Sequence, residues 1–235
     1  MKGILTLIPT PIDEENQLEA CAKELLQTAF INEKEKSIFV VEEHKAGRRR
    51  WIRFGLPREA VEDFFLYNEH NNQKSAEKLL LELKSGKNIY LMSDGGLPAF
   101  CDPGRILVDL CHKNKIKVTA TPFPNSIILA LSMSGFESNK FVFEGFLPRE
   151  KKERMKRLNE ILKDKRTLVL MDTPYRLERI LDELKVAMKK HSREIFLAMD
   201  IGSSTEELLR GTVESVLKRL KEKKREFVIV INACV

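Results

Sequence analysis

The sequence predicts an α/β protein made of two α/β domains, each built on a largely parallel sheet. Short runs rich in β-branched and aromatic residues alternate with longer amphipathic stretches along the chain. Some of these runs, such as Thr-Leu-Val-Leu-Met at 167–171, are almost continuously apolar, which is typical of strands that helices cover on both faces. The segment Thr-Pro-Phe-Pro-Asn at 121–125 interrupts the alternation, so we expect one domain over 1–121 and another over 122–235.

In chain order, the expected strands are the short apolar runs at 4–8, 37–41, 89–93, 117–120, 141–144, 167–171, 195–199 and 227–231. The expected helices are the amphipathic stretches at 19–30, 58–67, 74–84, 105–114, 126–134, 151–163, 176–189 and 206–224. Open α/β sheets bind ligands beyond the carboxyl ends of their strands. The loops that follow strands are therefore the expected location of any active site.

The composition is that of a folded chain with a modest positive charge. The 235 residues are 43% hydrophobic and 32% charged, with 11 glycines and 9 prolines, which excludes a collagen, a low-complexity coil and an acidic disordered tail. The net charge of +6 is uneven, because residues 149–166 hold nine basic and four acidic side chains and residues 45–53 hold five basic and no acidic ones. Each stretch alone is ordinarily a solvated helix face, but together they favour a polyanionic partner.

The cysteines and histidines are too scattered to predict a metal site. The chain has neither a CxxC pair nor an HExxH segment, so we expect no metal. Scattered thiols are typical of a reduced intracellular protein. The apolar run at 4–8 is too short for a signal sequence or a membrane span, so we expect a cytoplasmic protein with no membrane partner.

The most informative loop follows the expected strand at 89–93 and reads Ser-Asp-Gly-Gly-Leu-Pro-Ala-Phe-Cys-Asp-Pro-Gly at 93–104. Gly95 and Gly96 allow the backbone to approach a ligand closely, and the carboxylates of Asp94 and Asp102 accept hydrogen bonds from hydroxyl or ammonium groups. The glycine patterns of phosphate-binding and dinucleotide-binding loops are absent from the sequence. Two tight turns without any function explain the same residues, and the spacing alone does not decide between these readings.

This loop resembles the cofactor loop of the tetrapyrrole methylase superfamily, in its branch of ribosomal RNA small subunit methyltransferase I. Further segments resemble that family in the same order along nearly the whole chain: Pro-Thr-Pro-Ile at 9–12, Asn-Glu-His-Asn at 68–71, Gly-Phe-Leu-Pro at 145–148 with Lys151 and Arg154, and Glu-Glu at 206–207 with Arg-Gly-Thr at 210–212. The resemblance implies a two-domain α/β enzyme that binds S-adenosylmethionine in the cleft between its domains. It also implies a homodimer that methylates a ribose 2′-hydroxyl of ribosomal RNA, so ribosomal RNA or the small ribosomal subunit is the expected partner.

The positions that the resemblance assigns to the cofactor lie in both expected domains. They are Pro11, Asp94, Gly95, Gly96, Leu97 and Asp102 in the first, and Asn125, Ser126, Leu170 and Met171 in the second. Some of these have an ordinary structural alternative. Asn125 precedes an apolar helix that it can cap, and the apolar strand end at 170–171 can be plain core.

Transfer of a methyl group to a hydroxyl is helped by a base. The adjoining proton carriers Glu69 and His70 are the first candidates, followed by Asp102 and Asp200, although a polar run such as Asn-Glu-His-Asn-Asn is also an ordinary turn. The side chains expected to contact the substrate are Arg49, Lys151, Arg154 and Arg176.

One departure from the family bears on the substrate. Met-Asp-Ile-Gly-Ser at 199–203 stands where the family has Arg-Glu-Leu-Thr-Lys, so two cations are missing. Such cations supply much of the affinity for nucleic acid. Two alternatives therefore stay open: methylation of a tetrapyrrole or another small acceptor, and a non-catalytic protein that binds S-adenosylmethionine or associates with the ribosome.

Overall fold

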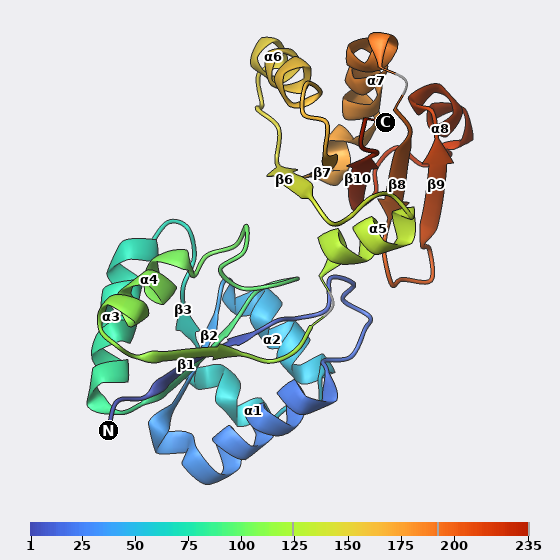
Figure 1. The fold of residues 1–235 in the computed structure, drawn as a ribbon. Coiled ribbons are helices and arrows are strands. Elements are labelled where there is room, and N and C mark those ends of the chain that lie inside the picture. Colours follow the sequence, from blue (N-terminus) through green and yellow to red (C-terminus); the bar gives the residue numbers. More distant parts are fainter. Residues whose placement is uncertain (124, 192, 235) are drawn as a thin grey trace. The chain divides into compact units, whose positions relative to one another are not determined.

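The computed structural model describes residues 1–123, 125–191 and 193–234, and the chain divides into two compact units, residues 1–123 and 124–235 (Figure 1). All eight expected strands are present, together with two short strands that were not expected. Each unit has a five-stranded sheet with helices on both faces.

The sheet of the first unit is parallel in every described pairing and has the strand order β3-β2-β4-β1-β5 (Figure 1). Its strands are β1 (Ile4–Ile8), β2 (Ser37–Val41), β3 (Phe65–Leu66), β4 (Asn88–Met92) and β5 (Lys117–Ala120). The helices are α1 (Ala20–Glu33), α2 (His44–Arg53), α3 (Asn72–Ser85) and α4 (Arg105–Lys113). The expected parallel sheet is confirmed for this unit.

Alternation along the strands divides the core of the first unit into two layers. On one face Ile8, Phe39 and Tyr90 pack with side chains of α1 and α2, such as Leu26 and Trp51. On the other face lie side chains of α3 and α4, packed against the alternate strand residues Leu5, Val40, Ile89 and Leu91. Burial on both faces explains why these strands are almost continuously apolar.

The sheet of the second unit is mixed, with the strand order β6-β7-β10-β8-β9. Its strands are β6 (Phe141–Gly145), β7 (Thr167–Asp172), β8 (Ile195–Met199), β9 (Glu207–Gly211) and β10 (Phe227–Ile231). The β6–β7 pair is parallel, whereas β7–β10, β10–β8 and β8–β9 are antiparallel. The expectation of a largely parallel sheet is therefore wrong here. An apolar run reports burial on both faces, and that burial does not fix strand direction.

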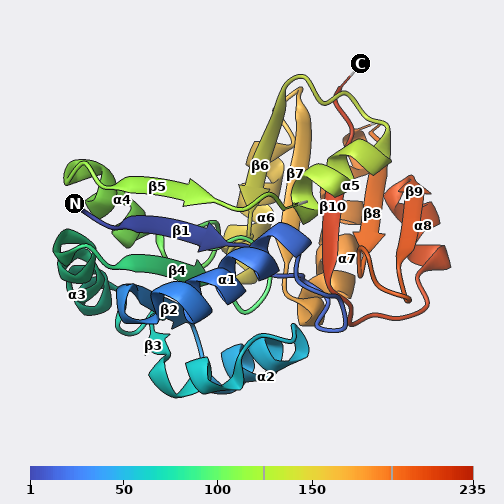
Figure 2. The same cartoon turned by 90° about the horizontal axis from the view of Figure 1, so that it is seen from below.

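Helices again cover both faces of this sheet. Figure 2 shows α5 (Ser126–Ser134) on one face, where Ile127 and Leu131 pack with Val169, Phe196 and Val228. The other face is covered by α6 (Lys151–Ile161), α7 (Leu177–Ala187) and α8 (Val213–Arg219). Among the described residues of both units, no helix is long and apolar enough to cross a membrane.

Two expected helices differ in the structure. Residues 58–67 form a short 3₁₀ helix (Arg58–Asp63) and then β3, because Phe65 and Leu66 pair with the edge of β2. Residues 206–224 divide into β9 and α8 at Gly211, whose φ of +147° ends the strand. Thr212 then caps α8, its hydroxyl accepting a hydrogen bond from the Ser215 amide at 3.2 Å.

Candidate active site

The carboxyl ends of the parallel strands bring four loops to one edge of the first sheet. Residues 9–12 follow β1, Glu42 and Glu43 follow β2, 67–71 follow β3 and 93–104 follow β4. The register of β1 and β2 against β4 determines where these loops begin along the sheet, since Ile8 lies opposite Met92 and Val40 opposite Leu91. Segments far apart in the sequence are thereby placed side by side at this edge.

The loops after β1 and β4 are joined by an isolated antiparallel bridge between Thr10 and Gly96. Each amide donates to the other residue's carbonyl oxygen at 2.9 Å. The Thr10 hydroxyl donates to the Ser93 carbonyl at 2.9 Å, and the Ser93 hydroxyl donates to the Gly96 carbonyl at 2.9 Å. The predicted cofactor residues Pro11, Asp94, Gly95 and Gly96 therefore come together on a rigid support.

Arg50 of α2 is hydrogen-bonded to the loop after β1 and lies beneath the loop after β4. Its side chain is 4% exposed, and its Nη1 donates to the Pro11 carbonyl at 2.7 Å. A Cβ built on Gly95 would lie 3.3 Å from Nη2 of Arg50, so the glycine admits the guanidinium beneath the loop. Sequence reasoning missed this role and placed Arg50 among the solvated bases of 45–53. Two sequence signals could have shown that Arg50 lies on a buried helix face. It follows the small residue Ala46 by four positions, and it is adjacent to Trp51.

The second half of the β4 loop turns sharply through left-handed residues. Ala99 (φ +65°), Cys101 (φ +63°) and Gly104 (φ +136°) all lie in that region. The Ala99 amide donates to the Pro103 carbonyl at 3.1 Å, and a Cβ on Gly104 would approach the Ala99 Cβ to 2.9 Å. This turn holds Leu97 and Asp102, both half-buried, at the same edge.

Three carboxylates with raised pKa values gather at this edge. Burial and the charge of Asp102 raise the pKa of Glu42 to about 7, and burial and the charge of Asp94 raise the pKa of Asp102 to about 6. Burial and the charge of Glu43 raise the pKa of Asp94. The Asp94 backbone amide donates to Glu42 Oε1 at 3.2 Å, which offsets part of the rise in the pKa of Glu42. Sequence reasoning did not select Glu42, yet the rule that ligands lie beyond strand ends applies to it as it does to Asp94.

The mutual repulsion of these carboxylates is relieved by a cation. A bound ligand with positive charge stabilises their ionised forms, whereas a phosphate is repelled. Among the described residues, no group of three or more His, Cys, Asp or Glu side chains has a geometry that could hold a metal ion. The charge of the edge favours a ligand that is positively charged and donates hydrogen bonds.

The predicted bases Glu69 and His70 lie in an exposed turn after β3. Asn68 Oδ1 accepts from the amides of His70 (3.1 Å) and Asn71 (3.2 Å), and Asn71 Oδ1 accepts from the Asn68 amide at 2.9 Å. The turn thus has its own structural explanation. Glu69 is nevertheless close enough to contribute to the raised pKa values of Glu42 and Asp102.

Asp200, the third predicted base, lies in the second unit and fastens the turn between β8 and β9. Its Oδ2 accepts from Arg225 Nε at 2.7 Å and from the Thr205 hydroxyl at 3.1 Å. Arg225 also donates to Glu207 Oε2 at 2.6 Å. The structure thus gives Asp200 a structural role, since its carboxylate joins the residues before β9 to Arg225.

The predicted cofactor positions of the second unit take ordinary structural places. Asn125 caps α5, its Oδ1 accepting from the amides of Ile127 at 2.9 Å and Ile128 at 3.3 Å, so the capping alternative is confirmed. Ser126 begins that helix and is half-buried. Leu170 is 1% exposed in the core, and Met171 is half-buried on the opposite face of β7.

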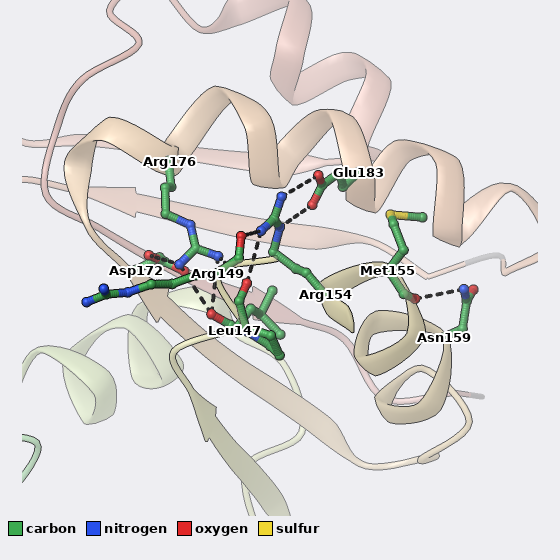
Figure 3. A network of polar contacts seen from close by, with 9 residues as sticks. Leu147, Arg149, Arg154, Met155, Asn159, Asp172, Arg176 and Glu183 are labelled. Carbon is green, nitrogen blue, oxygen red and sulfur yellow. Dashed lines mark hydrogen bonds and ion pairs between the residues drawn. The ribbon is translucent and has the colours of Figure 1, made fainter. Parts of the chain in front are cut away.

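Two of the predicted substrate arginines are held inside the second unit (Figure 3). Arg154 is 1% exposed, and its Nε and Nη2 donate to the two oxygens of Glu183 at 2.6 and 2.7 Å. Its Nη1 donates to the carbonyls of Pro148 (3.0 Å) and Arg149 (2.5 Å). The prediction that Arg154 contacts a substrate is therefore wrong, because all its bonded donors serve the fold.

Arg176 supports the same segment. It forms an ion pair with Asp172 at 3.2 Å and donates to the carbonyls of Leu147 at 3.2 Å and Pro148 at 2.9 Å (Figure 3). The Gly-Phe-Leu-Pro segment at 145–148 is thus fixed by two arginines. The other predicted substrate residues are accessible: Lys151 is exposed, and Arg49 pairs at the surface with Glu14 at 2.5 Å.

Comparison with protein families gives one match over most of the chain. The family model described as Tetrapyrrole (Corrin/Porphyrin) Methylases matches residues 5–217. The chain is 32% identical over 233 residues to the ribosomal RNA small subunit methyltransferase I of Halalkalibacterium halodurans, with 98% of this chain and 76% of that protein covered. It is 33% identical over 235 residues to the protein of the same name from Buchnera aphidicola, with 98% and 79% covered.

Solved structures share the fold. A structure of diphthine synthase matches with a TM-score of 0.66 at 14% identity, covering 98% of this chain and 90% of that one. A uroporphyrin-III C-methyl transferase from Thermus thermophilus, complexed with S-adenyl homocysteine, matches with a TM-score of 0.56 at 14% identity, covering 98% and 97%.

Replacing Arg154 with Met should lower the free energy of unfolding by about 3–5 kcal/mol, because Glu183 is left buried without its partner. The double variant Arg154→Met/Glu183→Leu should recover part of the loss, since no buried charge remains. Urea unfolding at pH 7 measures both, with the exposed Lys152→Met as the control on the same helix. A loss below about 1 kcal/mol in the single variant, typical of an exposed pair, contradicts the structural role of Arg154.

The raised pKa of Glu42 should make the protein less stable as the pH rises. The unfolded carboxyl loses its proton near pH 4.5, but the folded one keeps it until about pH 7. The contribution of the protonated Glu42 carboxyl to the free energy of unfolding is fully present below pH 4.5 and is lost as the pH rises through 7. Between pH 5 and 8, Glu42→Gln should gain about 1–2 kcal/mol relative to wild type, as followed by urea unfolding. Glu62→Gln, an exposed carboxylate of the same unit, should follow wild type, and parallel pH profiles for all three proteins contradict the burial of Glu42.

Proposed function

This chain belongs to the tetrapyrrole methylase family, and on that premise we propose that it transfers a methyl group from S-adenosylmethionine to ribosomal RNA. The observation that carries the proposal is the group of Glu42, Asp94 and Asp102 around the glycine loop. The acceptor is taken from relatives named ribosomal RNA small subunit methyltransferase I, which align over nearly the whole chain. We further propose, from the family resemblance, a ribose 2′-hydroxyl as the acceptor, a homodimer and a cytoplasmic location.

The carboxylates and the open glycine backbone at the strand ends of the first unit suit S-adenosylmethionine. When bound, this cofactor supplies an electrophilic methyl on a sulfonium, and it also carries an ammonium group. A Cβ at Gly96 would meet nothing within 4 Å, so the backbone there is open to a ligand. Asp94 and Asp102 accept hydrogen bonds from ammonium or hydroxyl groups, while Pro11, Gly95 and Leu97 shape the edge. Glu42 stabilises a nearby cation more than the neutral thioether that remains after transfer.

The same carboxylates are the chain's best candidates for moving a proton. A group with a pKa near the working pH takes up and releases protons efficiently, and the pKa of Glu42 is about 7. We therefore add Glu42 to the earlier candidates Glu69 and His70 as the base that accepts the proton of an attacking hydroxyl. In this proposal the arginine-paired Asp200 has only its structural role.

Methylation of a tetrapyrrole is the second candidate function. It is favoured by the description of the matching family and by the fold shared with a uroporphyrin-III C-methyl transferase. The missing cations at 199–203 favour a small acceptor as well. A non-catalytic protein that binds S-adenosylmethionine is the remaining alternative.

Isothermal titration should show binding of S-adenosylmethionine with a Kd in the micromolar range, on the order of −8 kcal/mol. Affinity should fall as the pH drops from 7.5 to 5.5, because protonation of Glu42 and Asp102 removes the negative charge that holds the cation. S-adenosylhomocysteine, which lacks the sulfonium, should show a weaker pH dependence. Glu42→Gln should flatten the profile, and Gly95→Val should reduce affinity about tenfold or more, because the added side chain crowds the Arg50 guanidinium and the open backbone of the loop. No binding of either compound at any pH contradicts the proposed site.

Labelled S-adenosylmethionine tests the acceptor. Small-subunit RNA stripped of modifications should gain label at a ribose 2′-oxygen, which nuclease mapping locates. Label in a tetrapyrrole and none in RNA supports the second candidate function. Binding of the cofactor without transfer to either supports the non-catalytic alternative.

A further inference from the structure

A hollow lies entirely within the second unit. It is open, has a volume of about 540 Å³ and is formed by the start of α6, by α7, by the turn after β7 and by the segment before β10. Its lining combines one aromatic ring with many charged side chains: Lys151, Tyr175, Glu178, Arg179, Asp182, Glu183, Lys223 and Lys224. The cofactor proposal uses none of these residues.

Tyr175 presents its ring to solvent on a rigid support. It is 75% exposed, more than any other large hydrophobic side chain in the described part of the chain except Met1. The ring is held in the turn Pro174–Arg176, where the Arg176 amide donates to the Thr173 carbonyl at 2.9 Å and the Arg176 side chain is bound to Asp172. Lys224 Nζ lies 4.1 Å from the ring centroid. An exposed ring beside a cation is thus fixed in place.

The charges of the hollow leave an excess of free cations. Glu178 pairs with Lys223, and Glu183 is occupied by the buried Arg154. Within the described residues, the side chains of Lys151 and Arg179 have no ion pair or hydrogen bond, and the side chain of Lys224 has only its contact with the ring. Asp182 is the one lining carboxylate that is left without an ion pair to a described residue.

We propose that this hollow binds single-stranded RNA, with an unpaired base stacked on the face of Tyr175 that Lys224 does not cover, and with backbone phosphates on Lys151, Arg179 and Lys224. A positively charged groove with an exposed aromatic ring is the arrangement that binds single strands, because every base has a face that stacks. In a duplex those faces are covered by neighbouring bases. The proposal rests on the proposed function in that it takes RNA as the partner, and it assigns a surface that positions the RNA.

The test is fluorescence anisotropy with the full chain and a labelled single-stranded RNA of about 12 nucleotides, alone and annealed to its complement. Wild type should bind the single strand more tightly than the duplex. Tyr175→Ala should weaken single-strand binding about tenfold, and Tyr175→Phe, which keeps a ring, should bind as wild type does. S-adenosylmethionine affinity and the unfolding midpoint should stay unchanged in both variants, which shows that the fold is intact.

Salt dependence tests the cations separately. Lys151→Gln/Arg179→Gln should reduce the slope of log K against log salt by about 1.4, since two phosphate contacts to a single strand are lost. Lys140→Gln/Lys218→Gln removes the same charge from exposed positions outside the hollow and should keep the wild-type slope. Equal slopes for both double variants overturn the assignment of the phosphates.

The outcomes separate this surface from the proposed reaction. If RNA is methylated but Tyr175→Ala leaves the KM for RNA and the single-strand affinity unchanged, the surface is wrong and the function stands. If single strands bind in a Tyr175-dependent way but no methyl is transferred, the function is wrong and the surface stands. A wild type that binds no single-stranded RNA, or that prefers an acidic peptide of equal charge, overturns the proposal.

Discussion

The parallel pairing of β1 and β2 with β4 is the constraint on which the candidate active site depends. Because parallel strands all end at the same edge, the register that sets Ile8 opposite Met92 brings the loops after β1 and β4 together, and a separate antiparallel bridge between Thr10 and Gly96 then joins them. A slip of one residue exchanges the two faces of a strand and breaks both hydrogen bonds of that bridge. The pairing of β2 with β4 therefore brings Glu42 to the β4 loop, where its carboxylate accepts from the Asp94 amide, and the buried Arg50 supports the neighbouring β1 loop through the Pro11 carbonyl.

Buried arginines also support loop segments in the second unit. Because their charge lies inside the fold, the net charge overstates the positive charge that is available at the surface. Arg154 and Arg176 bind carbonyls of the segment after β6, and Arg193 donates to the carbonyls of Asp164 at 2.9 Å and Arg166 at 2.7 Å near the end of α6. Such carbonyls have no partner within a helix or strand, and a guanidinium with five donors satisfies several at once. Part of the basic charge of residues 149–166 is thus internal, and Arg157 is likewise paired with Glu144.

The strands and most helices were predictable because apolar periodicity reports burial directly. The prediction failed in the second sheet, because burial of a strand on both faces does not determine whether it runs parallel or antiparallel to its neighbours. It also failed in α2, where the charged residue Arg50 lies on the buried face of the helix. The glycine loop and its aspartates could be selected as a candidate site because strand ends and glycines are visible in the sequence, and the structure places them at the strand ends as expected. Arg154 was misassigned because its partner Glu183 lies 29 positions away, a distance that no local pattern reveals.

If the proposed cofactor binds at the strand ends, Glu42 also makes its binding a proton-exchange reaction. At neutral pH Glu42, with its pKa of about 7, is partly protonated, and an arriving cation drives that proton into solution. The heat measured on binding then contains the ionisation heat of the buffer that takes up the proton. Titrations in phosphate and in Tris would consequently give different apparent enthalpies at the same affinity, and their difference would count the protons released.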